Sequence, residues 1–215
     1  MNNLPNIEFK KPLQNPTIDS EFSLFELPFY KNEEYFSNID NFVQFIKNVE
    51  KMVRTSIYYK KYINYLKNDL GLDYCQVLSN IKSDEKDKIE IHMHHGPILT
   101  LFDYVSIITD YMLIKKEKIN TFIIADKVLE EHFNNIIQVV MLSKTVHEEV
   151  HANNIFLNLK QAFGDLNCFI KKYKDGINNE YKEKINKYIE TSLKYDSFDK
   201  ETLKLKDTIK CWAKK

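Results

Sequence analysis

Proline placement divides this chain into two unlike parts. Four of its five prolines lie within the first 28 residues: Pro5, Pro12, Pro16 and Pro28. Proline has no backbone N–H to donate, and it disfavours helical geometry in the residue before it, so this stretch cannot form a continuous helix. We therefore predict an extended N-terminal arm over residues 1–40, which carries three lysines against seven acidic residues.

Helical periodicity begins at Asn41. Apolar residues from Phe42 to Ile57 recur at steps of three and four, which places them on one face of a long helix. This helix should end near Leu70, because Gly71 can adopt the left-handed conformation that ends helices.

The rest of the chain is also mostly helical in pattern. Residues 171–215 hold thirteen lysines against eight acidic residues and are typical of helices with solvated faces. We expect a predominantly helical α+β protein, in which residues 41–173 form one domain and residues 174–215 form a helical tail packed on it.

Composition excludes several classes of function. The 31 basic and 31 acidic residues cancel, so the chain is not a protein that coats nucleic acid by bulk charge. No apolar run approaches the roughly 20 residues of a membrane span, and the N-terminus lacks the apolar core of a signal peptide. Four glycines leave no glycine-rich phosphate loop. Three distant cysteines (Cys75, Cys168 and Cys211) fit a soluble protein of a reducing compartment such as the cytoplasm.

The histidines are the strongest indication of chemistry. All six lie within one stretch of about sixty residues: His92, His94, His95, His132, His147 and His151. Histidine binds metals and also accepts protons near neutral pH, so we interpret this clustering as a metal site rather than as unrelated core residues. His132 lies outside the two motifs described next and is interpreted as a structural or surface residue.

The first motif is a strand. The segment IEIHMHH, residues 89–95, alternates and is followed by Gly96 and Pro97, which predicts a strand entering a tight turn. Alternation places His92 and His94 on one face and His95 on the other, unless the turn twists the end of the strand.

The second motif is a strand followed by a helix. IIQVVMLS, residues 136–143, predicts a short buried strand, and residues 144–153 predict a helix. His147 and His151 stand one turn apart on that helix and can share one ion. Between the two motifs, residues 99–116 and 125–135 predict two further helices.

Together the two motifs resemble the ββα-metal finger of HNH endonucleases. QVVMLSKTVHEEVH (138–151) resembles its strand and histidine helix, and IEIHMHHGP (89–97) resembles its strand that ends in paired histidines. The pattern is most similar to the four-histidine form in colicin-type DNases, and the wider sequence resembles HNH-like proteins encoded by phages. The finger would cover about residues 89–153, with a helical insertion between its strands.

The resemblance implies a function and a role for each residue. It implies metal-dependent hydrolysis of DNA phosphodiester bonds, in the host cytoplasm if a phage encodes the chain. His94, His147 and His151 would bind one divalent ion (Mg²⁺, Mn²⁺, Ni²⁺ or Zn²⁺), and His95 would take a proton from the attacking water. An alternative register makes His94 the base, and His92 is an additional candidate because it shares the face of His94.

Departures from the family pattern keep other functions open. Gln138 stands where the family has the asparagine that orients the base, whereas Lys144 is a candidate phosphate contact at the start of the histidine helix. One alternative is a catalytically inactive HNH-derived module that acts through protein or nucleic-acid contacts. The other is a zinc metalloprotease, because HEEVH matches HExxH with Glu148 as general base, although Glu149 is a charge where that motif has an uncharged residue.

Overall fold

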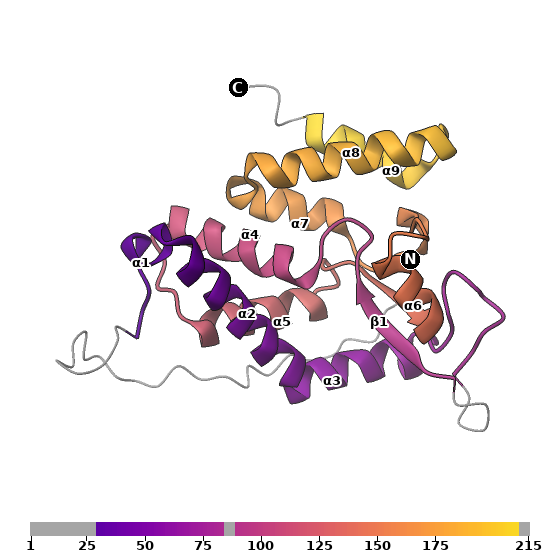
Figure 1. The fold of residues 1–215 in the computed structure, drawn as a ribbon, viewed down its shortest axis with the longest axis horizontal. Helices are drawn as coiled ribbons and strands as arrows, with labels where there is room; N and C mark the ends of the chain where they lie inside the picture. Colours follow the sequence, from indigo (N-terminus) through magenta and orange to yellow (C-terminus); the bar gives the residue numbers. More distant parts are fainter. Residues whose placement is uncertain (1–28, 84–88, 211–215) are drawn as a thin grey trace.

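The structure, a computed structural model, describes residues 29–83 and 89–210. Helices dominate it around one two-stranded antiparallel sheet, which confirms the predominantly helical α+β class (Figure 1). In chain order the elements are α1 (Glu33–Ser37), α2 (Ile39–Thr55), α3 (Ile57–Asn64), the π-helical turn η1 (Tyr65–Asp69), β1 (Ile91–His95), α4 (Leu101–Ile114), α5 (Thr121–Phe133), β2 (Val139–Ser143), α6 (Lys144–His151), the 3₁₀ turn η2 (Leu159–Gln161), α7 (Leu166–Tyr173), the 3₁₀ turn η3 (Lys174–Gly176), α8 (Asn179–Tyr195) and α9 (Lys200–Ile209).

The N-terminal region is helical earlier than the sequence predicted. Asn32 accepts a hydrogen bond from the N–H of Tyr35 and caps α1, and Asn38 caps α2 in the same way. The extended conformation predicted up to residue 40 is therefore wrong for residues 33–37 and 39–40, whereas Asn38 between the helices is extended. Residues 1–28 of the predicted arm lie outside the described residues.

The helix predicted from residue 41 to residue 70 is divided. Ser56 has extended backbone geometry, and its side chain accepts the N–H of Tyr58, so it ends α2 and caps α3. The break changes the direction of the chain between α2 and α3 (Figure 1). Gly71 has a positive φ of 69°, as predicted for the residue that ends this region.

The two strands predicted from the motifs are present and pair with each other in antiparallel orientation. Ile91 lies opposite Ser143, and His95 lies opposite Val139. The predicted helical insertion, now α4 and α5, separates the strands in sequence. Ser143, the last residue of β2, is also the N-cap residue of α6, so the histidine helix leaves the strand without a loop.

Other segments bound the second edge of β2. The N–H of Gln76 donates to the carbonyl of Met141 at 2.8 Å, and Phe163 forms an antiparallel bridge with Val139. Since β1 lies along the first edge, both edges of β2 are covered, which fixes the strand in place.

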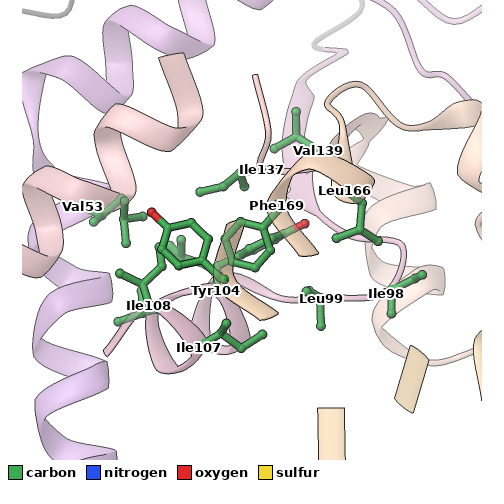
Figure 2. Packing of buried hydrophobic residues seen from close by; sticks show 14 of the residues in the cluster. Val53, Ile98, Leu99, Tyr104, Ile107, Ile108, Ile137, Val139, Leu166 and Phe169 are labelled. Carbon is green, nitrogen blue, oxygen red and sulfur yellow. The ribbon is translucent and has the colours of Figure 1, made fainter. Parts of the chain in front are cut away.

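The core holds the sheet against the helices. Figure 2 shows Tyr104 of α4 and Phe169 of α7 packed among aliphatic side chains, with their rings edge to face and their centroids 4.7 Å apart. The Tyr104 hydroxyl also accepts the backbone N–H of Gln138 at 3.0 Å. This bond ties α4 to the start of β2, so the insertion positions the strand that leads into the histidine helix.

The C-terminal helices are attached to the same core. In Figure 1, α8 and α9 lie above α7 and run alongside it. Lys184 of α8 pairs with Asp103 of α4 at 2.5 Å, and Lys172 of α7 pairs at 2.7 Å with Glu131 of α5, whose side chain is fully buried. Within the described part of the chain, no helix is both long enough and apolar enough to cross a membrane.

Candidate metal centre

Three histidines converge where α6 meets β1. His94 comes from β1, whereas His147 and His151 come from α6, and one ring nitrogen from each lies within 4.8 Å of the other two. The Nε2 atoms of His147 and His151 are 3.2 Å apart. We call these three residues the histidine triad. The structure thus brings together the three residues that the sequence predicted as metal ligands.

Local structure explains this convergence. His147 and His151 are one helical turn apart, so their side chains share a face of α6. Because α6 starts directly at the end of β2, that face stays close to β1, the strand paired with β2. Strand alternation turns His94 toward this outer face, and its ring centroid lies 5.1 Å from the ring centroids of both His147 and His151.

The environment of His94 and His147 favours their neutral forms. Burial, together with the neighbouring imidazoles of His147 and His151, lowers the pKa of His94 to about 4. Burial also lowers the pKa of His147, and His151 and His92 act in the same direction. Neutral imidazole is the form that binds metals, so His94 and His147 need not lose a proton to a metal ion at neutral pH.

The donor set fits a particular class of metal ion. Three imidazole nitrogens suit Zn²⁺, Ni²⁺ and similar transition metals, whereas Mg²⁺ prefers oxygen ligands. A centre of three protein ligands leaves coordination positions for water or substrate, as in catalytic zinc sites. His151 is exposed and His94 and His147 are half-buried, so that open side would face solvent.

His92 lies on the same outer face but outside the triad. Its ring stacks on that of His147 with the centroids 5.9 Å apart. Its Nε2 atom lies 3.1 Å from Oε2 of Glu90, and its side chain is 41% exposed. Alternation had predicted that His92 and His94 share a face, and the structure confirms it. Glu90 was not singled out from the sequence, because its contact with His92 depends on how both side chains turn.

His95 lies on the inner face, with His132. The two Nε2 atoms are 3.0 Å apart, and His132 Nδ1 lies 2.8 Å from the carbonyl oxygen of Val128. Since a carbonyl only accepts, His132 must donate from Nδ1, and its Nε2 then accepts from His95. The ring of Tyr59 stacks on His95 with the centroids 6.0 Å apart. The structure therefore does not bring His95 to the triad.

His132 is a structural residue of the core, which is one of the two interpretations, structural or surface, that the sequence allowed. It is fully buried, and burial lowers its pKa to about 4. Burial and His132 itself lower the pKa of His95 well below its usual range. Val128 and Leu129 precede His132 by four and three residues, and both are buried. Helical periodicity therefore could have indicated the buried position of His132, although not its partner.

The two remaining candidate residues, Gln138 and Lys144, do not contact the triad within the described part of the chain. Gln138 is 6% exposed, and its Nε2 is 3.5 Å from the carbonyl oxygen of Gly164, so its side chain turns toward the segment after η2. Its Oε1 atom is buried and has no hydrogen-bond partner among the described residues. Lys144 is the first residue of α6 and is exposed. No contact of either residue with the triad is present in the described part of the chain.

Comparison with known proteins identifies a family. No curated protein and no solved structure matches the sequence significantly. The sequence does match a family described as bacteriophage G278-like virion proteins, and the match runs from residue 7 to residue 212. It includes both strands, the histidine helix and the C-terminal helices. The chain therefore belongs to the family of bacteriophage G278-like virion proteins.

Proposed function

We propose that the histidine triad binds one divalent transition-metal ion and that the protein uses it to hydrolyse phosphodiester bonds in DNA. The observation that carries this proposal is the convergence of His94, His147 and His151 within 4.8 Å. A second support is the chain order of strand, strand and helix, which the HNH resemblance implies for a ββα-metal finger, although the insertion of α4 and α5 between the strands is long for that motif. The donor set favours Zn²⁺ or Ni²⁺ over Mg²⁺ or Mn²⁺.

The chemistry would be divided between the metal and the chain. A bound metal ion would supply Lewis-acid stabilisation of charge on the phosphate and on the leaving oxygen. The chain must also supply a proton acceptor beside the metal. The resemblance assigns this role to His95, which stays a prediction and requires the inner face of β1 to open. His92 is the alternative acceptor, because it is exposed on the outer face and contacts Glu90.

A plasmid-nicking assay tests this function. Metal-stripped protein would receive Mg²⁺, Mn²⁺, Ni²⁺ or Zn²⁺ singly, with His147→Ala, His95→Gln and His92→Gln run beside the wild type. We expect metal-dependent conversion of supercoiled plasmid that is lost in His147→Ala. Whichever of the other two variants loses cleavage while retaining metal would identify the proton acceptor. If the folded wild type binds metal but does not cleave plasmid with any of the four ions, the nuclease proposal is wrong.

One observation favours a second candidate function. His95 is 5% exposed and hydrogen-bonded to His132, so the residue that the resemblance assigns as base is buried in the core. We propose as the alternative a non-catalytic module, in which the metal stabilises the fold and the surface binds protein or nucleic acid. Because the family is one of virion proteins, its place would be in the phage particle, whereas the cytoplasmic location stays a prediction.

A further inference from the structure

The turn between α8 and α9 presents the two most exposed large apolar side chains of the described residues. Phe198 is 83% exposed and Tyr195 is 77% exposed. The ring of Tyr195 packs against that of Phe156, which is also exposed, with the centroids 5.6 Å apart. Neighbouring exposed aromatic side chains are typical of contact surfaces, because water solvates them poorly. We call Tyr195 and Phe198 the aromatic turn.

Hydrogen bonds order the aromatic turn. The carboxylate of Asp196 accepts the backbone N–H of Phe198 at 3.0 Å. Asp199, which is buried, accepts the hydroxyl of Thr202 at 2.5 Å and donates its backbone N–H to the carbonyl of Asp196 at 3.2 Å. A turn that is already ordered loses little conformational entropy when a partner binds it.

Two exposed lysines flank the aromatic turn. Lys194 precedes Tyr195 at the end of α8, and Lys200 is the first residue of α9. Both carboxylates of the turn itself, those of Asp196 and Asp199, accept hydrogen bonds within it. A partner surface that suits the turn therefore combines apolar walls with carboxylates that can face the two lysines.

The same chain has such a surface along α4. A cavity of about 410 Å³ lies between α4 and the starts of α2 and α8. A second cavity, of about 330 Å³, lies between the start of α1, the C-terminal end of α4 and η3. The two cavities adjoin, because Asp110 and Asn178 line both, and we call them together the α4 groove. A cavity of about 150 Å³ is enough for benzene, so either of them has room for an aromatic side chain.

Apolar side chains form much of the walls of the α4 groove. Ile39 and Phe42 of α2 and Phe102 of α4 line the larger cavity, whereas Ile114 lines the smaller one. Ile39 is 69% exposed and Ile114 is 57% exposed, so both remain largely in water. A partner that covers the groove would remove this apolar surface from water, which favours binding.

Carboxylates line the same walls, and Asp110 belongs to both cavities. Its side chain is partly buried and forms neither a hydrogen bond nor an ion pair with a described residue. Burial raises the pKa of Asp110 to about 6, and no neighbouring positive charge offsets this desolvation. Glu33 and Glu180 also form no ion pair with a described residue, whereas Asp103 and Asp175 are already paired with lysines. The groove therefore offers unpaired carboxylates to a cation.

We infer that the α4 groove of one copy of this chain receives the aromatic turn of a second copy. Phe198 would enter the larger cavity, and Lys194 and Lys200 would face Asp110 and Glu180. The second copy is the occupant because the aromatic turn carries both kinds of group that the groove can bind, an exposed ring and flanking positive charges.

One copy cannot fill its own α4 groove with its own aromatic turn. The groove lies at the start of α8 and the turn at its end, and the 17 residues of this helix span about 25 Å. Figure 1 shows α1 on the left and the turn between α8 and α9 on the right. A contact between two unlike surfaces leaves one groove and one turn free, so association continues into rings or longer chains of copies.

Sedimentation velocity of the full chain over a wide range of protein concentration tests this contact. We expect the average mass of the wild type to rise beyond that of two chains, and to fall at high salt because salt screens the lysine contacts. Phe198→Ser and Lys200→Glu each alter the turn, and Ile39→Lys alters the groove. Each variant should raise the dissociation constant about tenfold or more.

Mixing two of the variants distinguishes this contact from other modes of association. Phe198→Ser keeps an intact groove and Ile39→Lys keeps an intact turn, so an equimolar mixture can form one wild-type contact per pair. We expect the mixture to form a complex of two chains that does not grow with concentration, although each variant alone stays a single chain. Association of two turns with each other would instead persist in Ile39→Lys.

Ile57→Ser is the matched control. Ile57 is an exposed isoleucine at the start of α3 and lines neither cavity, so this variant should associate as the wild type does. The inference is overturned if the wild type stays a single chain at the highest concentration, if Phe198→Ser or Ile39→Lys associates as the wild type does, or if the mixture forms no pair. All the substituted side chains are exposed, so thermal unfolding should show that each variant keeps its fold.

The inference does not depend on the proposed function. No residue of the histidine triad lines the α4 groove or belongs to the aromatic turn. Variants that stay single chains should therefore bind Zn²⁺ as the wild type does, and a loss of association with unchanged Zn²⁺ binding bears on the contact alone.

Discussion

At the scale of single residues, the two faces of β1 place its histidines in different chemical environments. His94 and His92 point outward to α6, where ring nitrogens converge near solvent. His95 points inward and donates to His132, which in turn donates to a backbone carbonyl. This inner chain of hydrogen bonds works only while His132 Nε2 is unprotonated. Acid should therefore disrupt the inner pair.

The inner pair predicts a pH-dependent stability. Burial lowers the folded-state pKa of His132 to about 4, compared with about 6.5 in an unfolded chain. The contribution of neutral His132 to the free energy of unfolding is thus fully present above pH 6.5 and is lost as the pH falls toward 4. This loss amounts to about 3 kcal/mol of the free energy of unfolding from His132 alone. Urea unfolding in EDTA at several pH values between 8 and 4 would measure it.

His132→Gln is the comparison for this prediction. Glutamine keeps an acceptor for His95 but does not titrate, so the decline of stability below pH 6.5 should become shallower. Part of the decline should remain, because the pKa of His94 and that of His95 are also lowered by burial. An identical decline in the variant and the wild type would contradict the role assigned to His132.

At the scale of elements, Gly164 packs closely against the backbone of the segment that leads into β2. Gly164 has a φ of +109°, and a Cβ there would lie 2.4 Å from the carbonyl oxygen of Ile137. We expect Gly164→Ala to lower the free energy of unfolding by about 2–4 kcal/mol, because both the backbone conformation and the space exclude a methyl group. Urea unfolding would measure the loss.

Gly71→Ala provides the control for this prediction. Gly71 also has a positive φ, 69°, but a Cβ there would meet nothing within 4 Å. Its substitution should cost only the left-handed strain of about 1–2 kcal/mol. Equal losses for the two variants would show that the contact with Ile137 does not matter.

The sequence predicted those elements whose signals are local. The helices at 101–114 and 144–151 follow from apolar periodicity and from the strand that precedes the second of them. The break at Ser56 was missed, because apolar residues continue in helical register through Ile57 and hide the cap. The start of α5 was placed four residues too late, although Asn120 caps it at Thr121.

The site was predictable only as far as spacing reaches. Helical spacing alone predicted that His147 and His151 share one face, whereas the HNH resemblance, and not alternation, selected His94 as their partner. The contact of His95 with His132 joins residues 37 positions apart and depends on tertiary packing. It leaves no pattern in the sequence.

At the scale of the whole molecule, the histidine region is not an isolated finger. The insertion between its strands supplies His132 and the core residue Tyr104, whose hydroxyl holds the start of β2. Lys184 ties α8 back to α4. The family match over residues 7–212 covers this whole arrangement. Experiments on metal binding and on DNA should therefore use the full chain rather than an excised ββα segment.

The most direct test of the account is calorimetric titration of metal-stripped full-length protein with Zn²⁺. We predict that one ion binds per chain. The affinity of His147→Asn for Zn²⁺ should fall by more than the roughly 10–100-fold that is typical when a residue hydrogen-bonded to a metal ligand is mutated, because His147 would itself be a ligand. His92→Asn, which removes a histidine from the same face but outside the triad, should keep one ion per chain. Absence of Zn²⁺ binding by the wild type, or unchanged affinity in His147→Asn, would contradict the claim that the triad is a metal centre.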